Sequence, residues 1–312
     1  MNRQISIVIL NWNAADDTIR CIGQMDQWQQ VQAQIWVVDN HSQDNSVAEI
    51  TSACPHVHLI RNQANLGFAG GTNRGLQAAL VKREHPVLLL NNDALVDETA
   101  IAQLLQTLTQ DRSIGMVGPL LYHAEQRDQL IAAGSQNPVW HLQNLIKTIP
   151  ADQSTYAVNY ISGSVALVRA EALRRVGWLD EDYFFYTEVA DWCQRARQQG
   201  YRTVVDPQAR AYHNLNRSAP ARNALYVYYL IRNRFIYIHK AYHQFYRWLR
   251  LPLYAFWTLY CLLLTLQLRI KGNAARSKAV WVGLTDGLSG RWGGQNERVL
   301  ALCAQAAGSI QA

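Results

Sequence analysis

The stretch Pro86-Val-Leu-Leu-Leu-Asn-Asn-Asp-Ala94 decides the fold of this chain. Its apolar part, residues 87–90, is short and uncharged, which is typical of a strand buried on both faces of a sheet. The run then ends on Asn91, Asn92 and Asp93, and polar groups at the end of a central strand are costly unless something binds them. Ligands in open α/β sheets sit just beyond the carboxyl ends of strands. The stretch therefore predicts either a binding site for a hard cation and a diphosphate or an ordinary Asn/Asp turn.

Two earlier apolar runs end in the same way. Residues 5–10 lead into Asn11-Trp-Asn13, and residues 35–38 lead into Asp39-Asn40. Strands alternate with helices, so we expect a parallel, doubly wound sheet whose strand ends line one edge. The expected elements are strand 5–10, helix 15–30, strand 35–38, helix 44–53, strand 57–60, a Gly-rich loop at 65–75 leading into a helix that ends at 80, and strand 87–90.

The second half of this region is expected to continue the α/β pattern with less regularity. The expected elements are helix 97–110, strand 116–122, an irregular stretch at 123–157, a loop and strand at 160–168, helix 171–176, helix 187–199 and strand 202–205 followed by Ala211-Tyr-His213. Composition changes near residue 218, after which aromatic and basic residues alternate and 251–268 carries no charge. At 1.5 Å per residue that run reaches about 27 Å, marginally enough to span a bilayer. We therefore expect two domains, 1–217 and 218–312.

Composition narrows the class of protein. Nearly half of the 312 residues are hydrophobic, so a folded core is expected. Five scattered Cys residues without a CxxC pair argue against a disulfide framework and a zinc site and fit a reducing compartment. The net charge of +6 lies mostly after Arg195, among Trp and Tyr residues, which suits nucleic acid or an anionic membrane surface. No signal peptide is expected, because Met1-Asn-Arg-Gln leads directly into the first strand.

Seven motifs in a characteristic order resemble a known family. They are I-V-I-L-N-W-N (7–13), V-V-D-N-H-S (37–42), N-L-G-F-A-G-G-T-N-R-G (65–75), L-L-L-N-N-D (88–93), Y-I-S-G-S (160–164), D-E-D-Y-F-F-Y-T-E-V-A-D-W-C-Q-R-A (180–196) and Y-H (212–213). Over roughly 5–240 the chain looks like a family 2 glycosyltransferase, similar to the bacterial rhamnosyltransferases of cell-surface polysaccharide assembly. The resemblance implies a GT-A fold, a Rossmann-like, mostly parallel sheet flanked by helices, followed here by a C-terminal helical membrane-associated segment.

The resemblance also implies which residues bind the donor, a nucleotide diphosphate sugar. Asp39 would accept a hydrogen bond from an imide N–H of a pyrimidine, which suits an ionised carboxylate because it is acceptor-only; an Asx turn is the alternative for Asp39. The favoured donor is dTDP-rhamnose, with a UDP-sugar second. The implied nucleotide-sugar residues are Asn11, Asn13, Asp39, Asn40, Asn65, Gly67, Gly71, Asn91 and Asn92, with Gly163 and Ser164 at the donor or acceptor sugar.

A divalent cation, Mn²⁺ or Mg²⁺, is implied as cofactor. Asp93 would hold the metal against the diphosphate, but the two-acid D-x-D pattern of the family has only one carboxylate here because its first position is Asn91. His213 matches the family's late His and would add a further ligand, and imidazole suits Mn²⁺ better than Mg²⁺. A lone His after a strand is otherwise more often structural.

The catalytic base is expected on the helix that begins near 187. The family's E-D-x-D run reads Glu188-Val189-Ala190-Asp191 here, so its second acid is missing. Val189, Trp192, Cys193 and Ala196 fall at i, i+3, i+4 and i+7 and predict an apolar face that packs on the sheet. Glu188 and Asp191 share a different face, at a helix N-terminus that favours their charged form. Asp191 is placed ahead of Glu188 as the base, with the other acid orienting the acceptor or pairing with Arg195.

Four classes of function remain in view. A nucleotide-binding dehydrogenase is disfavoured because G-x-G-x-x-G is absent, and a nucleic-acid binder because 251–268 is purely apolar. An inactive glycosyltransferase-like scaffold stays open because of Val189. The main expectation is a metal-dependent, inverting hexosyltransferase that acts on a lipid-linked or polysaccharide acceptor at the cytoplasmic face of the plasma membrane.

Basic residues flank 251–268 on both sides, which opposes a simple span. A peripheral or monotopic helix, or a helical hairpin, at the cytoplasmic face is expected instead, with Trp248, Tyr254 and Trp257 near the interface. A buried core helix or a contact in a homo-oligomer is the alternative.

Overall fold

A computed structural model describes residues 3–81, 84–214, 220–242 and 247–308 of the chain. The chain divides into two compact units, which are described separately. Unit 1 comprises Met1–Asp180 and Val189–Leu215, and unit 2 comprises Glu181–Glu188 and Asn216–Ala312. The segment 181–188, expected within the first domain, thus belongs to unit 2. The expected break near 217 lies among residues outside those described.

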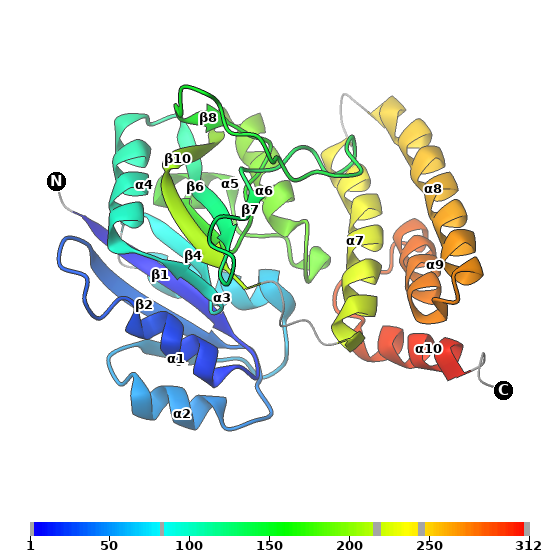
Figure 1. Cartoon of the computed structure of the whole chain (residues 1–312), viewed down its shortest axis with the longest axis horizontal. Helices are drawn as coiled ribbons and strands as arrows, with labels where there is room; N and C mark the ends of the chain where they lie inside the picture. The colour runs from blue at the N-terminus through cyan, green and yellow to red at the C-terminus, as the bar shows by residue number, and fades with distance from the viewer. Residues whose placement is uncertain (1–2, 82–83, 215–219, 243–246, 309–312) are drawn as a thin grey trace. The chain divides into compact units, whose positions relative to one another are not determined.

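Unit 1 is an α/β structure built around one sheet. Its elements are β1 (Gln4–Asn11), α1 (Ala15–Gly23), β2 (Gln32–Asp39), α2 (Ser46–Ala53), β3 (His58–Arg61), α3 (Gly67–Leu80), β4 (Val87–Asn91), β5 (Ala94–Val96), α4 (Glu98–Gln110), β6 (Ile114–His123), β7 (Leu130–Ala132), β8 (Tyr156–Ala157), β9 (Val165–Val168), α5 (Ala170–Val176), α6 (Glu188–Gln198, of which Glu188 is assigned to unit 2) and β10 (Arg202–His213). Figure 1 labels most of them.

The strand order is β3-β2-β1-β4-β9-β6-β10-β5, with β7 paired to β6 and β8 paired to β10. Strands β3, β2, β1 and β4 are parallel, as the alternation of strands and helices predicts. Strand β9 then enters antiparallel between β4 and β6. The helices flank the sheet (Figure 1), so the expected fold class is confirmed.

Side chains alternate between two cores, one on each face of the sheet. On β1, Ile5, Ile7 and Ile9 point into a core that includes side chains of α1, α2 and α4. Val8 points into the other core, which α3, α5 and α6 supply. Because strands such as β4 are covered on both faces, their sequences are apolar without interruption.

The expectation that 65–75 is a Gly-rich loop is wrong from Gly67 onward, because α3 begins at that residue. The glycines lie inside this helix, where they let it approach the sheet. A Cβ atom at Gly75 would come within 2.4 Å of Val8 Cγ1, and one at Gly71 within 2.5 Å of Leu10 Cδ1. Helix α1 is also shorter than expected and ends at Gly23.

Unit 2 is mostly helical. Its helices are η1 (Glu181–Tyr183), α7 (Pro220–Ala241), η2 (Arg247–Leu249), α8 (Arg250–Ile270), α9 (Ala274–Ser289) and α10 (Asn296–Gly308). Within this unit α7, α9 and α10 share an apolar core that also includes Phe184. Among the described residues, α8 alone has the length and composition of a helix that could cross a membrane, and only 17% of its most apolar window is buried.

Candidate active site

The carboxyl ends of β1, β2 and β4 lie side by side at one edge of the sheet. The parallel registers pair Asn11 with Asp39 and Leu10 with Asn91. Polar residues that are up to 80 positions apart in the chain thereby become neighbours. The expectation that the three polar strand ends share one edge is confirmed.

The end of β1 is bonded to the end of β2. Asn11 Nδ2 donates to Asp39 Oδ1 at 2.9 Å, and the Ser42 hydroxyl donates to the same oxygen at 2.6 Å. Asp39 Oδ2 accepts from the Ser42 backbone N–H at 3.1 Å, so the expected alternative, an Asx turn, is present. Sequence reasoning did not single out Ser42, although its position three residues after Asp39 is the signal for this turn. The Asp39 carboxylate is thus held in a single orientation.

Two further asparagines join neighbouring loops. Asn13 has a φ of 51° and accepts from the Gln43 backbone N–H at 2.7 Å, which links the turns after β1 and β2. Asn92 Nδ2 donates to the Thr18 hydroxyl at 3.1 Å, and that hydroxyl donates to Asn11 Oδ1 at 2.8 Å. Thr18 therefore connects the ends of β1 and β4.

Asn40 anchors the start of α3. Its Oδ1 accepts from Asn62 Nδ2 and from the Leu66 backbone N–H, both at 3.0 Å. Its Nδ2 donates to Asn65 Oδ1 and to the Gly67 carbonyl, also at 3.0 Å. These bonds use all the hydrogen-bonding positions that an amide ordinarily offers. Asn40 and Asn65 thus have a clear structural task, and their contact with the donor stays a prediction.

Asp93 and His213 form a second polar cluster at this edge. Strand β10 pairs antiparallel with β5 and sets His213 opposite Ala94, beside Asp93. His213 Nε2 lies 3.0 Å from Asp93 Oδ1 and 3.3 Å from Asn91 Nδ2. Both side chains of the Asp93–His213 pair are partly exposed, at 22% and 13%. A carboxylate and an imidazole that converge on one point can share a cation.

The cluster offers two protein ligands, and no group of three His, Cys, Asp or Glu side chains occurs in the described part of the chain. Mg²⁺ typically binds through one or two carboxylates and completes its shell with water and substrate phosphates. Asp93 and His213 therefore suit a cation that arrives with a diphosphate. They suit a closed structural metal site less well.

The loop before β9 adds hydroxyl groups to this cluster. Ser164 Oγ lies 3.4 Å from Asn91 Nδ2 and 2.9 Å from Ser162 Oγ. Gly163 is packed closely, since a Cβ there would lie 3.1 Å from Val189 Cγ2 and 3.2 Å from Phe68 Cζ. These contacts are all within unit 1.

Helix α6 has the expected apolar face, since Val189, Trp192, Cys193 and Ala196 are all buried in one core. Asp191 is also buried, and its Oδ2 accepts from Arg195 Nε at 2.8 Å.

Arg195 donates further to the carbonyl oxygens of Val176 at 3.0 Å and Trp178 at 2.8 Å. Of the two acids, Asp191 thus has the role of pairing with Arg195. Glu188, the first residue of α6, is buried as well.

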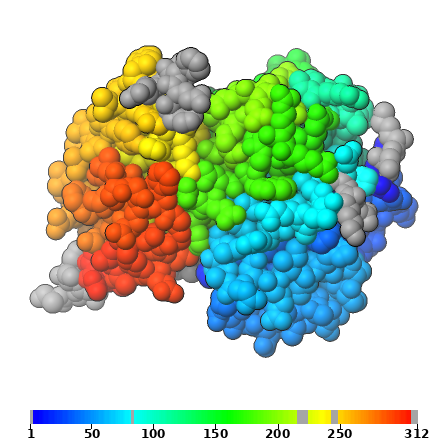
Figure 2. Space-filling view, turned by 180° about the vertical axis from the view of Figure 1, so that it is seen from behind, coloured from blue at the N-terminus to red at the C-terminus, as the bar shows by residue number. Residues whose placement is uncertain are grey.

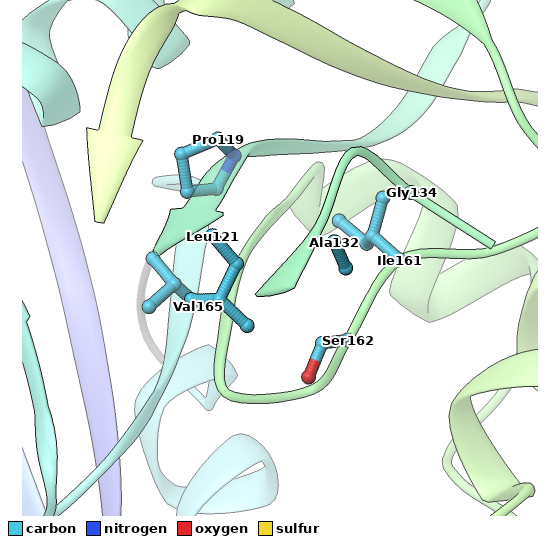
Figure 3. Close-up of a pocket in the computed structure, with 7 residues that line it drawn as sticks. All are labelled: Pro119, Leu121, Ala132, Gly134, Ile161, Ser162 and Val165. Carbon is cyan, nitrogen blue, oxygen red and sulfur yellow. The ribbon is translucent and has the colours of Figure 1, made fainter. Parts of the chain in front are cut away.

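The linings of two cavities in unit 1 do not include Asp39, Asp93 or His213. A cavity next to β6 and β9, whose lining side chains Figure 3 shows, has about 10 Å³ of water-accessible space, which is room for about one water molecule. Its lining is Pro119, Leu121, Ala132, Gly134, Ile161, Ser162 and Val165. A larger hollow of about 400 Å³ lies near Gln32 and Ala33, at the amino end of β2, away from Asp39. The polar strand ends therefore remain the candidate site.

The fold is that of the GT-A glycosyltransferases. The chain is similar in structure to the mannosyltransferase PcManGT from Pyrobaculum calidifontis, solved in complex with GDP-Man and Mn²⁺, with a TM-score of 0.58 and 15% sequence identity. The match covers 91% of this chain and 86% of that one.

Residues 6–177, more than half of the chain, match the family described as glycosyl transferase family 2. The chain belongs to this family and is a nucleotide-sugar-dependent glycosyltransferase. It is 28% identical to the low-salt glycan biosynthesis hexosyltransferase Agl10 of Haloferax volcanii, over 74% of each chain. It is 26% identical to the N-acetylglucosaminyl-diphospho-decaprenol L-rhamnosyltransferase of Mycobacterium tuberculosis, over 81% of this chain and 88% of the relative.

Proposed function

We propose that the protein transfers rhamnose from dTDP-rhamnose to a lipid-linked or polysaccharide acceptor, with inversion at the anomeric carbon. A UDP-sugar is the second candidate donor. The observation that carries the proposal is the edge of the sheet where the Asp39 and Asp93 clusters meet. The relative named as an L-rhamnosyltransferase supports the choice of sugar, and its name, which includes a diphospho-decaprenol, supports a lipid-linked acceptor.

The nucleotide would bind at the ends of β1 and β2. A pyrimidine carries an imide N–H, and Asp39 is a buried carboxylate held by Asn11 and Ser42, so it accepts such a donor without rearranging. Asn13 would lie near the same group because it is tied to the turn that contains Ser42.

Asp93 and His213 would hold Mn²⁺ or Mg²⁺, which supplies positive charge to a diphosphate leaving group. Asn91 and Ser164, in hydrogen-bonding contact with this pair or with each other, would bind the ribose or the donor sugar.

The acceptor hydroxyl must lose a proton as its oxygen attacks the anomeric carbon, and the nucleotide diphosphate leaves with the bonding electrons. A base for this step must be ionised and within hydrogen-bonding reach of the hydroxyl. The Arg195 contact favours a different order from the one expected from the sequence. We assign proton removal to Glu188, and to Asp191 the task of orienting Arg195 and the start of α6.

Donor and metal can be tested together. We expect dTDP-rhamnose with Mn²⁺ to raise the melting temperature more than other nucleotide sugars, because a ligand specific to the folded state stabilises it. Asp93→Ala should abolish the metal-dependent part of this shift and reduce transfer at least about 100-fold. Glu125→Ala, a change in another loop of unit 1, serves as the control. Full transfer by Asp93→Ala, or in excess chelator, would contradict the metal role.

An inactive scaffold is the second candidate, and Val189 in place of the family's acid favours it. A protein that binds the donor yet transfers sugar to none of a panel of lipid-linked acceptors would support the scaffold over the enzyme.

We also propose that α8 rests on an anionic membrane surface. One narrow stripe of the helix is buried, formed by Leu253, Trp257 and Cys261 at intervals of four residues. Seven large apolar side chains of the helix are exposed, namely Leu251, Phe256, Leu259, Leu262, Leu263, Leu266 and Ile270. An exposed apolar surface of this extent marks an interaction site. In Figure 2 the gold and orange atoms of this region are at the surface of unit 2.

The ends of α8 are basic, with Arg250 at the start and Arg269 and Lys271 at the finish. Basic charge around an apolar face suits anionic lipid headgroups. Trp248 is 67% exposed and would lie at the lipid interface. The expectation for Trp257 is wrong, because it is buried with the Arg234 guanidinium 4.2 Å from its ring centroid.

Flotation with liposomes tests this surface. The purified protein should float with phosphatidylglycerol vesicles and less with phosphatidylcholine vesicles. The double variant Leu259→Ser and Leu263→Ser should reduce flotation at least about tenfold, since each substitution removes apolar surface that the lipid would bury. Leu288→Ser, an exposed leucine of α9, is the matched control. A wild-type protein that ignores anionic vesicles, or that forms a stable dimer through α8, would contradict the proposal.

A further inference from the structure

The segment between η1 and α6 has an unusual backbone. Phe184, Tyr186 and Thr187 have φ angles of 63°, 66° and 76°, in the left-handed region that non-glycine residues rarely adopt. Thr187 is the most unusual, because it is β-branched. Such conformations persist only where surrounding contacts determine them, and they gather at functional sites. The next residue is Glu188, the first residue of α6.

A single amide on α7 holds the carbonyl groups of this segment. Asn233 Nδ2 donates to the carbonyl oxygens of Tyr183 at 3.2 Å, Phe185 at 2.8 Å and Tyr186 at 2.6 Å. Asn233 is completely buried, so water does not replace these bonds. The side chain therefore donates to buried backbone carbonyl groups of the segment, of which that of Tyr183 also accepts from the Phe185 backbone N–H at 2.7 Å.

The preceding residue, Arg232, fixes the orientation of that amide. Arg232 Nε and Nη2 donate to Asn233 Oδ1 at 3.0 and 2.8 Å, which turns the Asn233 amino group toward the segment. Arg232 Nη2 also donates to the Tyr183 carbonyl at 2.8 Å. Its guanidinium lies 4.8 Å from the ring centroid of Tyr229, on which Phe184 stacks at 5.4 Å.

Burying a guanidinium costs free energy unless its N–H groups donate hydrogen bonds. Here they donate to backbone carbonyl oxygens. Arg232 is completely buried, and the acceptors recorded for it are carbonyl and amide oxygens of unit 2, including Gly293 O. Lys240 Nζ adds a contact at the start of the segment, 2.6 Å from Asp182 Oδ2. Contacts from α7 thus determine one path of the chain up to Glu188.

We propose that Arg232 and Asn233 are positioning residues of the transfer reaction. They hold the chain at 183–187, where Phe184, Tyr186 and Thr187 adopt the left-handed conformation, on one path up to Glu188. This placement fixes Glu188, which belongs to the same unit. The proposal rests on the proposed function, because it assigns proton removal to the start of α6. Helix α7, outside the region matched by the family model, would then take part in catalysis without touching the reacting atoms.

The variants Asn233→Ala and Asn233→Asp test this role in the full-length protein. Asn233→Ala removes the donors, and Asn233→Asp keeps the shape but places a carboxylate against three carbonyl oxygens. We expect kcat to fall about 10- to 100-fold, since a small displacement of a catalytic group has effects of this size. The Kd for the donor, measured by calorimetry, should change less than about threefold, because donor-binding residues of unit 1 are unaltered.

Two measurements separate positioning from a general loss of stability. Ile231→Ala is the matched control, because Ile231 is buried on the same helix but packs against Gly283 of α9. It should lower the melting temperature and leave kcat within about twofold of the wild type. Hydrogen exchange should quicken for the amides of 184–188 in both Asn233 variants and stay unchanged in Ile231→Ala.

The outcomes distinguish this proposal from the proposed function. If the wild type transfers sugar and both Asn233 variants keep kcat within about threefold, the positioning role is overturned and the function stands. If exchange quickens equally in Ile231→Ala, the segment depends on the whole core and not on this dipeptide, and the proposal again fails. If the wild type transfers nothing, the proposed function fails first and this role fails with it. Should Asn233→Asp not fold, Asn233→Ala alone decides between these results.

Discussion

At the scale of the residue, the structure gives the two acids of α6 different surroundings. Asp191 is paired with Arg195, which holds the end of α5 through two carbonyl groups. Glu188 follows the left-handed segment directly. The residue types are those the sequence suggested for a base, and the different roles that we propose for them rest on these contacts.

We expect Glu188→Gln to reduce kcat about 10²- to 10⁴-fold, because the amide cannot take a proton from the acceptor. Donor affinity and melting temperature should stay near those of the wild type. Initial rates with saturating donor and a soluble analogue of the lipid acceptor provide the measurement. Transfer slowed less than about tenfold would place the base elsewhere.

Asp191→Asn should behave differently. It weakens a buried charge-assisted hydrogen bond and should lower stability by about 1–3 kcal/mol. Arg195→Gln is the informative comparison. If Asp191 acts through Arg195, both variants lose activity to a similar extent, whereas a base at Asp191 would leave Arg195→Gln much more active than Asp191→Asn.

At the scale of the element, the close contact between α3 and the sheet depends on glycine. Gly75 lies over Val8 and Val38 of β1 and β2, and both are branched side chains that cannot move aside cheaply. The helix begins at the end of the Asn65–Gly67 turn, so its distance from the sheet sets the position of one side of the candidate site.

Gly75→Ala should destabilise the protein by about 1–3 kcal/mol through overpacking. Gly23→Ala is the control, because a Cβ there meets nothing within 4 Å. That variant should be neutral or slightly stabilising, by up to about 1 kcal/mol, since alanine is the better helix former. Urea unfolding of both variants provides the comparison, and equal stabilities would contradict the packing argument.

At the scale of the whole molecule, the five cysteines are all free and buried. Burial raises the pKa of Cys21 to about 12, with hydrogen bonding from Gln24 opposing the shift and the charge of Asp93 adding to it. Burial likewise raises the pKa of Cys193 to about 11, although Thr203 and Arg197 oppose this. The thiolate is the reactive form, so these groups are protonated across the physiological range.

The native protein at about pH 8 should therefore react slowly with an aromatic disulfide reagent such as Ellman's reagent. In guanidinium chloride all five thiols should react at once, since an exposed thiol has a pKa near about 8.5. Fast reaction of one or more thiols in the native protein would show that a cysteine reaches solvent.

Much of this architecture was predictable from local pattern. Uninterrupted apolar runs marked β1, β2 and β4, and the polar residues after them marked one edge of the sheet. The i, i+3, i+4 and i+7 spacing identified the buried face of α6. The seven ordered motifs identified the family that residues 6–177 confirm. These features are encoded by periodicity and order, which act over short stretches of chain.

Other features depend on residues that are far apart in the sequence. Only the tertiary structure decided these features. Strand β9 enters antiparallel between β4 and β6, and His213 meets Asp93 across more than a hundred residues. The segment 181–188 lies in unit 2, held by Asn233.

The amino-acid sequence by itself determined the type of sheet, the family and the residues at the strand ends, because hydrophobic period and turn chemistry are local. The placement of Glu188, the partner of Asp191 and the burial of Trp257 were decided by the tertiary structure, because each depends on side chains from other elements that compete for the same space and hydrogen bonds.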